Sequence, residues 1–460
     1  MDEGALGASF RDPSGFVYER DGALFRQVNR SYADDYEQLM GSGLYQTLVD
    51  QRLLIPHAEV PSPLPESPEA HRTLLPERIH FISYPYEWSF SQLRDAALTT
   101  LAIQKLALRH DMVLKDASAY NVQFRAGRPV FIDSISFARY REGSPWVAYR
   151  QFCQHFLAPL ALAAHRDIRL LQLLRVYMDG VPLDLARTLL PARAWLNLHL
   201  LLHIRVHAGY QRRFANDTES AAKVRPISKS ALTNLISALE AATRKLRWKA
   251  TGTEWAEYYE GDSYDERSAA HKRALVDEYL AAIAPSVVWD LGANTGEFSR
   301  IAATRGAETV AFDVDPACVE RNYRQVRRAE ESRLLPLLLD LTNPSPALGW
   351  ATAERFSIME RGSADAVMAL ALIHHIAISN NVPLDRIAAF LAKIGESLII
   401  EFVPKSDPKV GLLLATREDV FPEYHEAGFE AAFGTAFETN AKTRIDGTER
   451  TLYRMKRRRP

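Results

Sequence analysis

Two acidic residues and two glycines follow apolar, strand-like runs in the C-terminal half of the chain. In "VVWDLGANTGEFS", Asp290 closes an apolar run and is followed by Gly292 and Gly296. The next apolar run, "ETVAFDVDP", leads to Asp313. Glycines let a backbone turn tightly beside a ligand, and an acidic residue about 20 positions further on can accept both ribose hydroxyls. The spacing predicts a nucleoside-binding site at the carboxyl edge of a parallel sheet.

The glycine pattern distinguishes between classes of nucleotide-binding enzyme. It reads D-x-G-x-x-x-G, with Asn294 between the two glycines. A dinucleotide-binding dehydrogenase would need G-x-G-x-x-G at this turn, so that class is disfavoured. Taken alone, the glycines also fit a plain turn between strand and helix in another doubly wound fold.

These residues resemble motif I of the class I S-adenosylmethionine-dependent methyltransferases, of which "DLGANTG" is a common form. The resemblance extends over residues 253 to about 456, where "LLPLLLDLTNPSP", "SADAVMALALIHHI" and "ESLIIEFVPKSDP" look like the third, fourth and fifth strands. The last 30 or so residues look like the antiparallel hairpin that closes such sheets. The resemblance implies that S-adenosylmethionine is the cofactor, with Asp340 at the adenine amino group and Leu341 against the ring. The implied cofactor-binding residues are Asp290, Gly292, Asn294, Gly296, Asp313, Asp340 and Leu341.

Candidate catalytic residues follow the expected fourth strand. Methyl transfer is an in-line displacement, and it needs a base only where the acceptor must lose a proton. His374 and His375 lie where an acceptor would be expected, although they also suit a helix start packed against the adenosine. Glu401 and Lys405 are weaker candidates on the same side. The aromatic-rich stretch "TEWAEYYEGDSY" forms either a lid over the cofactor or a helix packed on the sheet.

A second group of polar residues lies in the N-terminal half. Four residues separate Asp116 from Asn121 in "LKDASAYNVQF", and Asp133 ends an apolar run in "PVFIDSISF". Phosphotransferases use one carboxylate to orient the attacking hydroxyl, and an Asn with a second Asp to hold magnesium. The spacing predicts this role for Asp116, with Asn121 and Asp133 as metal ligands. Between these two ligands the residues read as two short strands around Ala126 and Gly127. The alternative is a β-hairpin whose polar residues only cap turns.

This second group resembles the catalytic loop and metal-binding Asp of the protein-kinase-like fold, especially the small-molecule kinases. The resemblance implies magnesium and ATP as ligands of this part of the chain. The sequence departs from that pattern because no lysine precedes Lys105 and no glycine-rich loop is evident. Arg26 or Arg30 would have to replace the missing lysine. Two hypotheses follow: a bifunctional methyltransferase and phosphotransferase, or a methyltransferase with a non-catalytic kinase-like binding domain.

The elements expected to hold the N-terminal group include both strands and helices. The alternating residues 15–29 surround Asp-Gly and predict a hairpin, and residues 31–54 have helical periodicity. Residues 60–72 are rich in proline and predict a loop, whereas residues 78–85 read as a strand. Residues 89–111 predict an amphipathic helix with a serine N-cap.

The fold class expected for the whole chain is α/β, with a Rossmann-like methyltransferase sheet preceded by an α+β kinase-like domain. Residues 1–215 form the kinase-like domain, 216–252 a linker and connecting helix, and 253–460 the methyltransferase domain. After the connecting helix the pattern alternates strand, turn and helix, which indicates parallel βαβ units. This layout looks like that of bacterial proteins described as nodulation-type methyltransferases.

Composition limits the partners and the compartment. The formal net charge is −1, so no global field attracts nucleic acid or a membrane surface. Two cysteines provide no disulfide framework, and the N-terminus lacks the features of a signal peptide, so we expect a cytoplasmic protein. The most apolar run, over residues 156–174, contains charged residues and reads as buried helix rather than as a membrane span. The methyl acceptor, a small molecule or a macromolecule, is unidentified.

Overall fold

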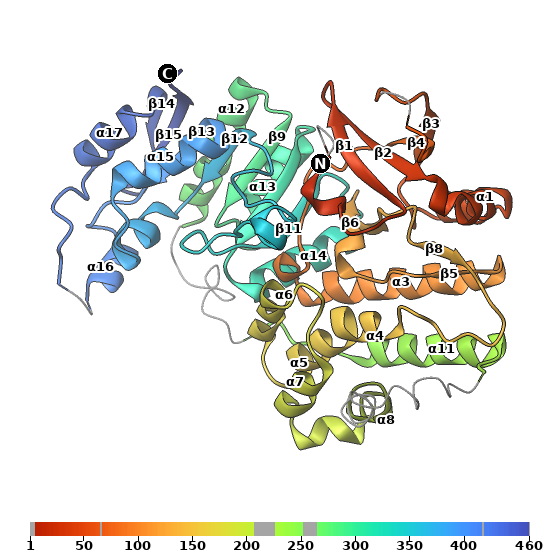
Figure 1. Cartoon of the computed structure of the whole chain (residues 1–460). Helices are drawn as coiled ribbons and strands as arrows, with labels where there is room; N and C mark the ends of the chain where they lie inside the picture. Colours follow the sequence, from red (N-terminus) through yellow and green to blue (C-terminus); the bar gives the residue numbers. More distant parts are fainter. Residues whose placement is uncertain (1–4, 65–66, 207–225, 252–264, 416–417, 460) are drawn as a thin grey trace. The chain divides into compact units, whose positions relative to one another are not determined.

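The computed structural model describes residues 5–64, 67–206, 226–251, 265–415 and 418–459 (Figure 1). The aromatic-rich stretch over residues 253–264 lies outside the described residues. The chain divides into two compact units. The first comprises Met1–Lys249 with Ala347–Arg355, and the second comprises Ala250–Pro346 with Phe356–Pro460. The connecting helix predicted after residue 216 is α11 (Lys229–Lys245), and it belongs to the first unit.

An antiparallel four-stranded sheet opens the first unit, in the order β1-β2-β4-β3. Asp21 and Gly22 both have positive φ angles, of 53° and 76°, and form the predicted hairpin turn. The predicted strand over residues 78–85 is wrong, because strand β4 begins at the end of the predicted loop of residues 60–72 and ends before residue 78. It pairs with β2, which is distant in sequence, and with β3, the strand just before it. The strands are β1 (Gly15–Arg20), β2 (Ala23–Asn29), β3 (His57–Val60) and β4 (Ala70–Pro76).

Helices form most of the rest of the first unit. The predicted helix over residues 89–111 is confirmed as α3 (Phe90–Arg109), whose Ser89 cap accepts the backbone N–H of Gln92 at 3.3 Å. Helix α11 packs on α3, where Glu240 forms an ion pair with Lys105. The other helices are α1 (Ala33–Gly41), α2 (Leu44–Asp50), α4 (Tyr149–Phe152), α5 (Ala158–His165), α6 (Leu173–Val176), α7 (Leu183–Leu189) and α8 (Leu198–Leu200). No helix in the described ranges is long and apolar enough to cross a membrane.

Two short strand pairs carry the polar group of the N-terminal half. They are β5 (Met112–Leu114) with β8 (Phe137–Arg139), and β6 (Val122–Arg125) with β7 (Arg128–Phe131). Both pairs are antiparallel. The second pair is the hairpin expected between Asn121 and Asp133, and its turn residues Ala126 and Gly127 have φ angles of 49° and 69°.

A seven-stranded sheet forms the second unit, in the order β11-β10-β9-β12-β13-β15-β14. The first five strands in this order are parallel, and β15 and β14 close the edge as an antiparallel hairpin. This is the arrangement that the resemblance to methyltransferases implied. The strands are β9 (Val287–Leu291), β10 (Glu308–Asp313), β11 (Leu334–Leu338), β12 (Ala364–Ala369), β13 (Gly395–Phe402), β14 (Phe437–Arg444) and β15 (Thr451–Arg457).

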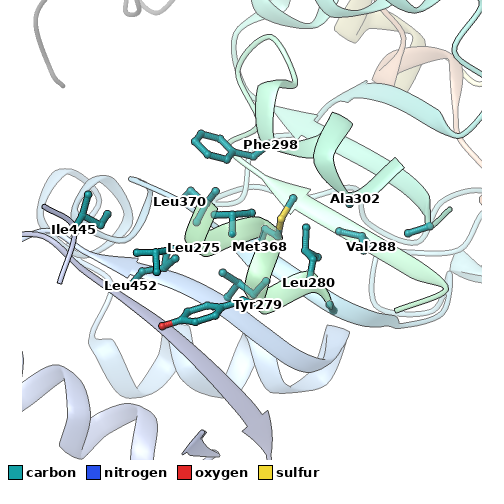
Figure 2. Packing of buried hydrophobic residues seen from close by; sticks show 14 residues of the cluster. Leu275, Tyr279, Leu280, Val288, Phe298, Ala302, Met368, Leu370, Ile445 and Leu452 are labelled. Carbon is teal, nitrogen blue, oxygen red and sulfur yellow. The ribbon is translucent and has the colours of Figure 1, made fainter. Parts of the chain in front are cut away.

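Helices cover the parallel strands because these strands are apolar on both faces. Figure 2 shows part of the core, where Leu275, Tyr279 and Leu280 of α12 pack with Val288 and Met368 of the sheet. All five side chains are at least nine-tenths buried. The helices are α12 (Glu266–Ile283), α13 (Glu297–Thr304), α14 (Pro316–Ala329), α15 (Leu384–Ile394), α16 (Pro408–Leu414) and α17 (Glu426–Gly434).

Candidate functional site

The strand order brings the predicted cofactor residues to one edge of the sheet. Strands β11, β10 and β9 are neighbours, and Asp340, Asp313 and Asp290 lie at or just beyond their carboxyl ends. Ligands of open α/β sheets bind outside this edge. The structure therefore gathers the three acidic residues that the sequence proposed for binding one nucleoside.

Asp290 is a buried carboxylic acid, with 2% of its surface exposed. The hydroxyl of Ser299 on α13 donates a hydrogen bond to its Oδ2 at 2.6 Å. The pKa of Asp290 is raised to about 7, mainly by burial and also by the nearby Asp313 carboxylate, although Ser299 and Lys272 act in the opposite direction. A carboxyl group with these surroundings becomes more readily ionised when a cation binds beside it.

The glycine turn after β9 depends on backbone angles that other residues adopt with strain. Gly292 and Gly296 have φ angles of +73° and +82°, and Asn294 between them has a φ of +51°. A Cβ atom on Gly296 would lie 2.5 Å from the side-chain amide nitrogen of Asn322, so a larger residue would have to displace that side chain as well as adopt a strained φ angle. The backbone N–H groups of Gly292 and Ala293 both donate to the carbonyl of Phe312 at 2.9 Å. The turn is therefore held against the end of β10.

Asp313 connects this turn to the second strand. The backbone N–H of Asn294 donates to its Oδ2 at 2.7 Å, and the backbone N–H of Asp315 donates to its Oδ1 at 2.8 Å. Burial raises the pKa of Asp313 to about 6 despite these hydrogen bonds. Two backbone donors fix the carboxylate in one orientation, as recognition of two adjacent ribose hydroxyls requires.

Asp340 and Leu341 lie beside Asp313, just beyond β11. The backbone N–H of Leu339 donates to the carbonyl of Asp313 at 2.9 Å. Asp340 is exposed, and its Oδ1 accepts the backbone N–H and the hydroxyl of Thr342 at 2.8 and 2.6 Å. These bonds hold the turn after β11 in a defined shape next to the predicted ribose position.

The two histidines after β12 are buried and close together. The centroids of the His374 and His375 rings are 4.0 Å apart, and His374 has no measurable exposure. Neither ring nitrogen of His374 has a hydrogen-bond partner among the residues that the structure describes. Burial lowers the pKa of His375 to about 4 and lowers that of His374 well below 6.5, with Arg450 acting in the same direction on both. Both rings are therefore neutral at pH 7.

A buried ion network near these histidines was not predicted from the sequence. Glu401 at the end of β13 is fully buried and pairs with Lys272 at 2.7 Å and with Arg450 at 3.3 Å. Arg450 also pairs with Asp407 at 2.7 Å. Only Glu401 had a sequence signal, its place after the fifth strand. Lys405, the other weak candidate, pairs with Asp419 at the surface instead.

The first unit brings the second group of predicted residues together. Ser136 connects two of them: Asn121 Nδ2 donates to its Oγ at 3.3 Å, and that hydroxyl donates to Asp133 Oδ2. Asp116 belongs to the same group, because the charge of Asp133 acts on it. Burial is the main cause that raises the pKa of Asp116; the Asp133 charge raises it as well, and the hydrogen bond from the Ser118 N–H lowers it.

A cation already contacts Asp133. The guanidinium of Arg26 on β2 donates from Nη1 to Asp133 Oδ1, so Arg26, rather than Arg30, reaches this group. Both carboxylate oxygens of the predicted metal ligand are therefore bonded to protein side chains. Within the described ranges, no cluster of three or more His, Cys, Asp or Glu side chains could hold a metal ion.

Comparison with known proteins identified one close relative over nearly the whole chain. The nodulation protein NoeA of Rhizobium meliloti (strain 1021) is 36% identical over 462 residues, covering 99% of this chain and 96% of that protein. No protein-family model matches the chain.

Solved structures resemble less than half of the chain. Magnesium protoporphyrin IX methyltransferase (ChlM) from Synechocystis PCC 6803, solved with bound SAH, is 20% identical with a TM-score of 0.32, covering 44% of this chain and 93% of that one. The bifunctional kinase-methyltransferase WbdD is 16% identical with a TM-score of 0.29, covering 45% and 43%.

Proposed function

The chain belongs to the family of the nodulation protein NoeA, and on that premise we propose that it is an S-adenosylmethionine-dependent methyltransferase. The family name specifies no reaction, so the proposal depends on the site in the second unit. The observation that carries it is the row of three carboxyl groups at the ends of β9, β10 and β11, two of them buried with raised pKa values.

The buried acids have the chemistry that this cofactor requires. S-adenosylmethionine carries positive charge on its sulfonium and ammonium groups and two hydroxyls on its ribose. Asp290 would pair with the positively charged methionine part, which favours the ionised form of a carboxyl group whose pKa is about 7 without a partner. Asp313 would accept the ribose hydroxyls. Asp340 and Leu341 would hold the adenine, and Gly292, Asn294 and Gly296 would shape the turn beside the ligand.

The catalytic contribution of the chain would be mainly to align the reactants. When bound, S-adenosylmethionine supplies a methyl group whose bond to sulfur breaks as the acceptor's lone pair forms the new bond. Holding the two reactants in line removes much of the entropic barrier. We keep His374 and His375 as candidate bases for an acceptor that must lose a proton. Both are neutral at pH 7, but burial lowers the pKa of both rings, so either would be a weak base until a bound acceptor changed its surroundings. The acceptor is unidentified, a small molecule or a macromolecule, and we propose a cytoplasmic reaction.

A binding experiment tests the proposal without knowledge of the acceptor. Calorimetric titration of the full chain with S-adenosylmethionine is expected to give one site per chain. Asp290→Asn should weaken binding about tenfold or more, since it removes a charge from the proposed contact. Asp385→Asn, on an exposed part of α15, is the matched control and should bind like the wild type. Absence of binding to the wild type would contradict the proposal.

For the first unit we propose a kinase-like companion domain that binds without transferring phosphate. The specific observation that favours this over the bifunctional alternative is the engagement of both Asp133 oxygens by Arg26 and Ser136. An Arg is also a different shape from the lysine that it would replace. Titration with ATP, with and without magnesium, separates the hypotheses. Magnesium-dependent ATP binding that is lost in Asp133→Ala would favour the bifunctional enzyme instead.

A further inference from the structure

The end of the glycine turn after β9 is held by the side chain of Arg300, a residue of α13. Its Nη1 donates to the carbonyl oxygens of Thr295 at 2.7 Å and of Gly296 at 3.0 Å, and these residues directly precede the helix. A peptide group is planar and trans, so a fixed carbonyl also fixes the direction of the N–H on the next residue. Arg300 therefore sets the orientation of the two peptide groups that close the turn.

The same guanidinium also bonds to residues outside the turn. Arg300 donates from Nε and Nη2 to the two carboxylate oxygens of Glu331 at 2.8 and 2.9 Å. Its Nη2 also donates to Asn322 Oδ1 at 3.0 Å. Asn322 lies on α14, and Glu331 follows the end of that helix. All three nitrogens of the guanidinium are engaged, and together they join the turn to α14 and to the loop after it.

These side chains are largely removed from solvent. The Arg300 and Glu331 side chains are 19% and 24% exposed, and Asn322 is 1% exposed. A guanidinium bonded to both oxygens of a carboxylate has a defined geometry, and partial burial reduces screening of the pair by salt. A fully exposed ion pair would contribute much less. Glu331 therefore keeps the guanidinium in the orientation in which it meets the turn.

Glycine at position 296 gives the guanidinium room to approach. A Cβ atom there would lie 2.8 Å from Arg300 Nη1. The turn also needs support, because Gly292, Asn294 and Gly296 have φ angles of +73°, +51° and +82°. Backbone in sparsely populated regions persists where the surrounding structure holds it in place. Arg300 supplies such contacts at the helical end of the turn.

The supported turn is more closely connected to Asp290 than to Asp313. It follows Asp290 along the chain, and the Asp290 carboxyl accepts its hydrogen bond from Ser299, the residue next to Arg300 on α13. Asp313 accepts one N–H from the turn, but it also accepts the N–H of Asp315, which lies outside the turn. Release of the turn would therefore disturb the surroundings of Asp290 more than those of Asp313.

We propose that Arg300 is a positioning residue for the methionine part of S-adenosylmethionine, which acts by holding the carbonyl groups of Thr295 and Gly296. This inference rests on the proposed function, in which Asp290 meets that part of the ligand. Arg300 does not itself contact the ligand, because its N–H groups are directed to the turn, Asn322 and Glu331. Its loss lowers the affinity for ligands that carry the amino-acid group and largely spares recognition of the nucleoside.

Two ligands that differ in the amino-acid part test this role. S-adenosylhomocysteine carries that part, and methylthioadenosine lacks it. Arg300→Lys keeps the positive charge but loses the planar fork of donors. In calorimetry on the full chain it should bind S-adenosylhomocysteine about tenfold more weakly and methylthioadenosine within about twofold of the wild type. Arg305→Lys, which alters an exposed pair with Asp277 at the end of the same helix, is the matched control and should change neither affinity.

A second variant tests the same role without a change at position 300. Glu331→Gln leaves the contacts of Arg300 with the turn available and removes the charge that orients the guanidinium. It should weaken binding of S-adenosylhomocysteine about threefold, again with methylthioadenosine spared. If Arg300→Lys does not fold, this selective loss supports the inference, and its absence overturns it.

The outcomes separate positioning from general damage to the fold. A folded Arg300→Lys with wild-type affinity for S-adenosylhomocysteine would overturn the inference. An equal loss of affinity for both ligands would also overturn it, because a distorted fold would not distinguish between them. If the wild type binds neither ligand, the proposed function fails instead, so the two failures are distinguishable.

Discussion

Replacing Asp290 with Asn should make the second unit more stable at high pH while weakening cofactor binding. The carboxyl group is buried, and its pKa is raised from 3.8 to about 7. The folded state therefore binds this proton more tightly than the unfolded state does. The resulting contribution to the free energy of unfolding is complete below about pH 4 and is lost as the pH rises to about 7. One pKa unit corresponds to about 1.4 kcal/mol, so the whole effect is about 4 kcal/mol, of which about 2.5 kcal/mol falls between pH 5 and pH 8.

Asn has the same shape, can accept the Ser299 hydrogen bond and does not titrate. The free energy of unfolding of Asp290→Asn, relative to wild type, should therefore increase by about 2.5 kcal/mol from pH 5 to pH 8. Guanidinium denaturation followed by circular dichroism at four pH values measures this difference, and Asp385→Asn is the control. Parallel pH curves for wild type and Asp290→Asn would refute the reasoning. The variant should also bind S-adenosylmethionine more weakly at pH 8, because the lost charge serves the ligand rather than the fold.

Three further substitutions test the packing, the turn and the ion network of the second unit. Met368→Ala, in the core of Figure 2, should lower the free energy of unfolding by about 2–5 kcal/mol in denaturant titration, and no loss would contradict the assigned packing. Gly296→Ala should weaken S-adenosylmethionine binding in calorimetry, since the residue would strain a φ of +82° and its Cβ would displace Asn322; unchanged affinity would show that the turn is not at the cofactor. Glu401→Gln leaves Lys272 and Arg450 without their shared carboxylate and should cost about 3–5 kcal/mol in thermal unfolding, whereas Glu396→Gln, which breaks an exposed pair, should cost under about 1 kcal/mol.

The parallel sheet and its ligand edge could be predicted because their signals are local. The apolar run before Asp290, the glycines after it and the next run ending at Asp313 each lie within a few residues. A buried parallel strand needs a continuous apolar run, and a tight turn needs glycine, so sequence and structure agree there. The hairpin around Ala126 and Gly127 agrees for the same reason.

Features that depend on distant partners could not be predicted. Strand β4 begins inside the segment predicted as a loop, because its pairing with the distant strand β2 outweighs a weak local preference. The sequence left Arg26 and Arg30 as equal candidates, and only the sheet register brings Arg26 to Asp133. The partners in the Glu401 network are equally remote in sequence. Charged residues ordinarily lie at the surface, so nothing in the sequence around Glu401 indicated that its ion network would be buried.

Calorimetric titration of S-adenosylmethionine into wild type and Asp313→Ala tests the central claim most directly. The wild type should bind one molecule per chain, and Asp313→Ala should bind at least about tenfold more weakly, because a charged acceptor of two ribose hydroxyls is worth well over 1 kcal/mol. Asp385→Ala, an exposed change in the same unit, should match the wild type. No binding to the wild type, or equal binding to Asp313→Ala, would contradict a methyltransferase cofactor site at this edge of the sheet.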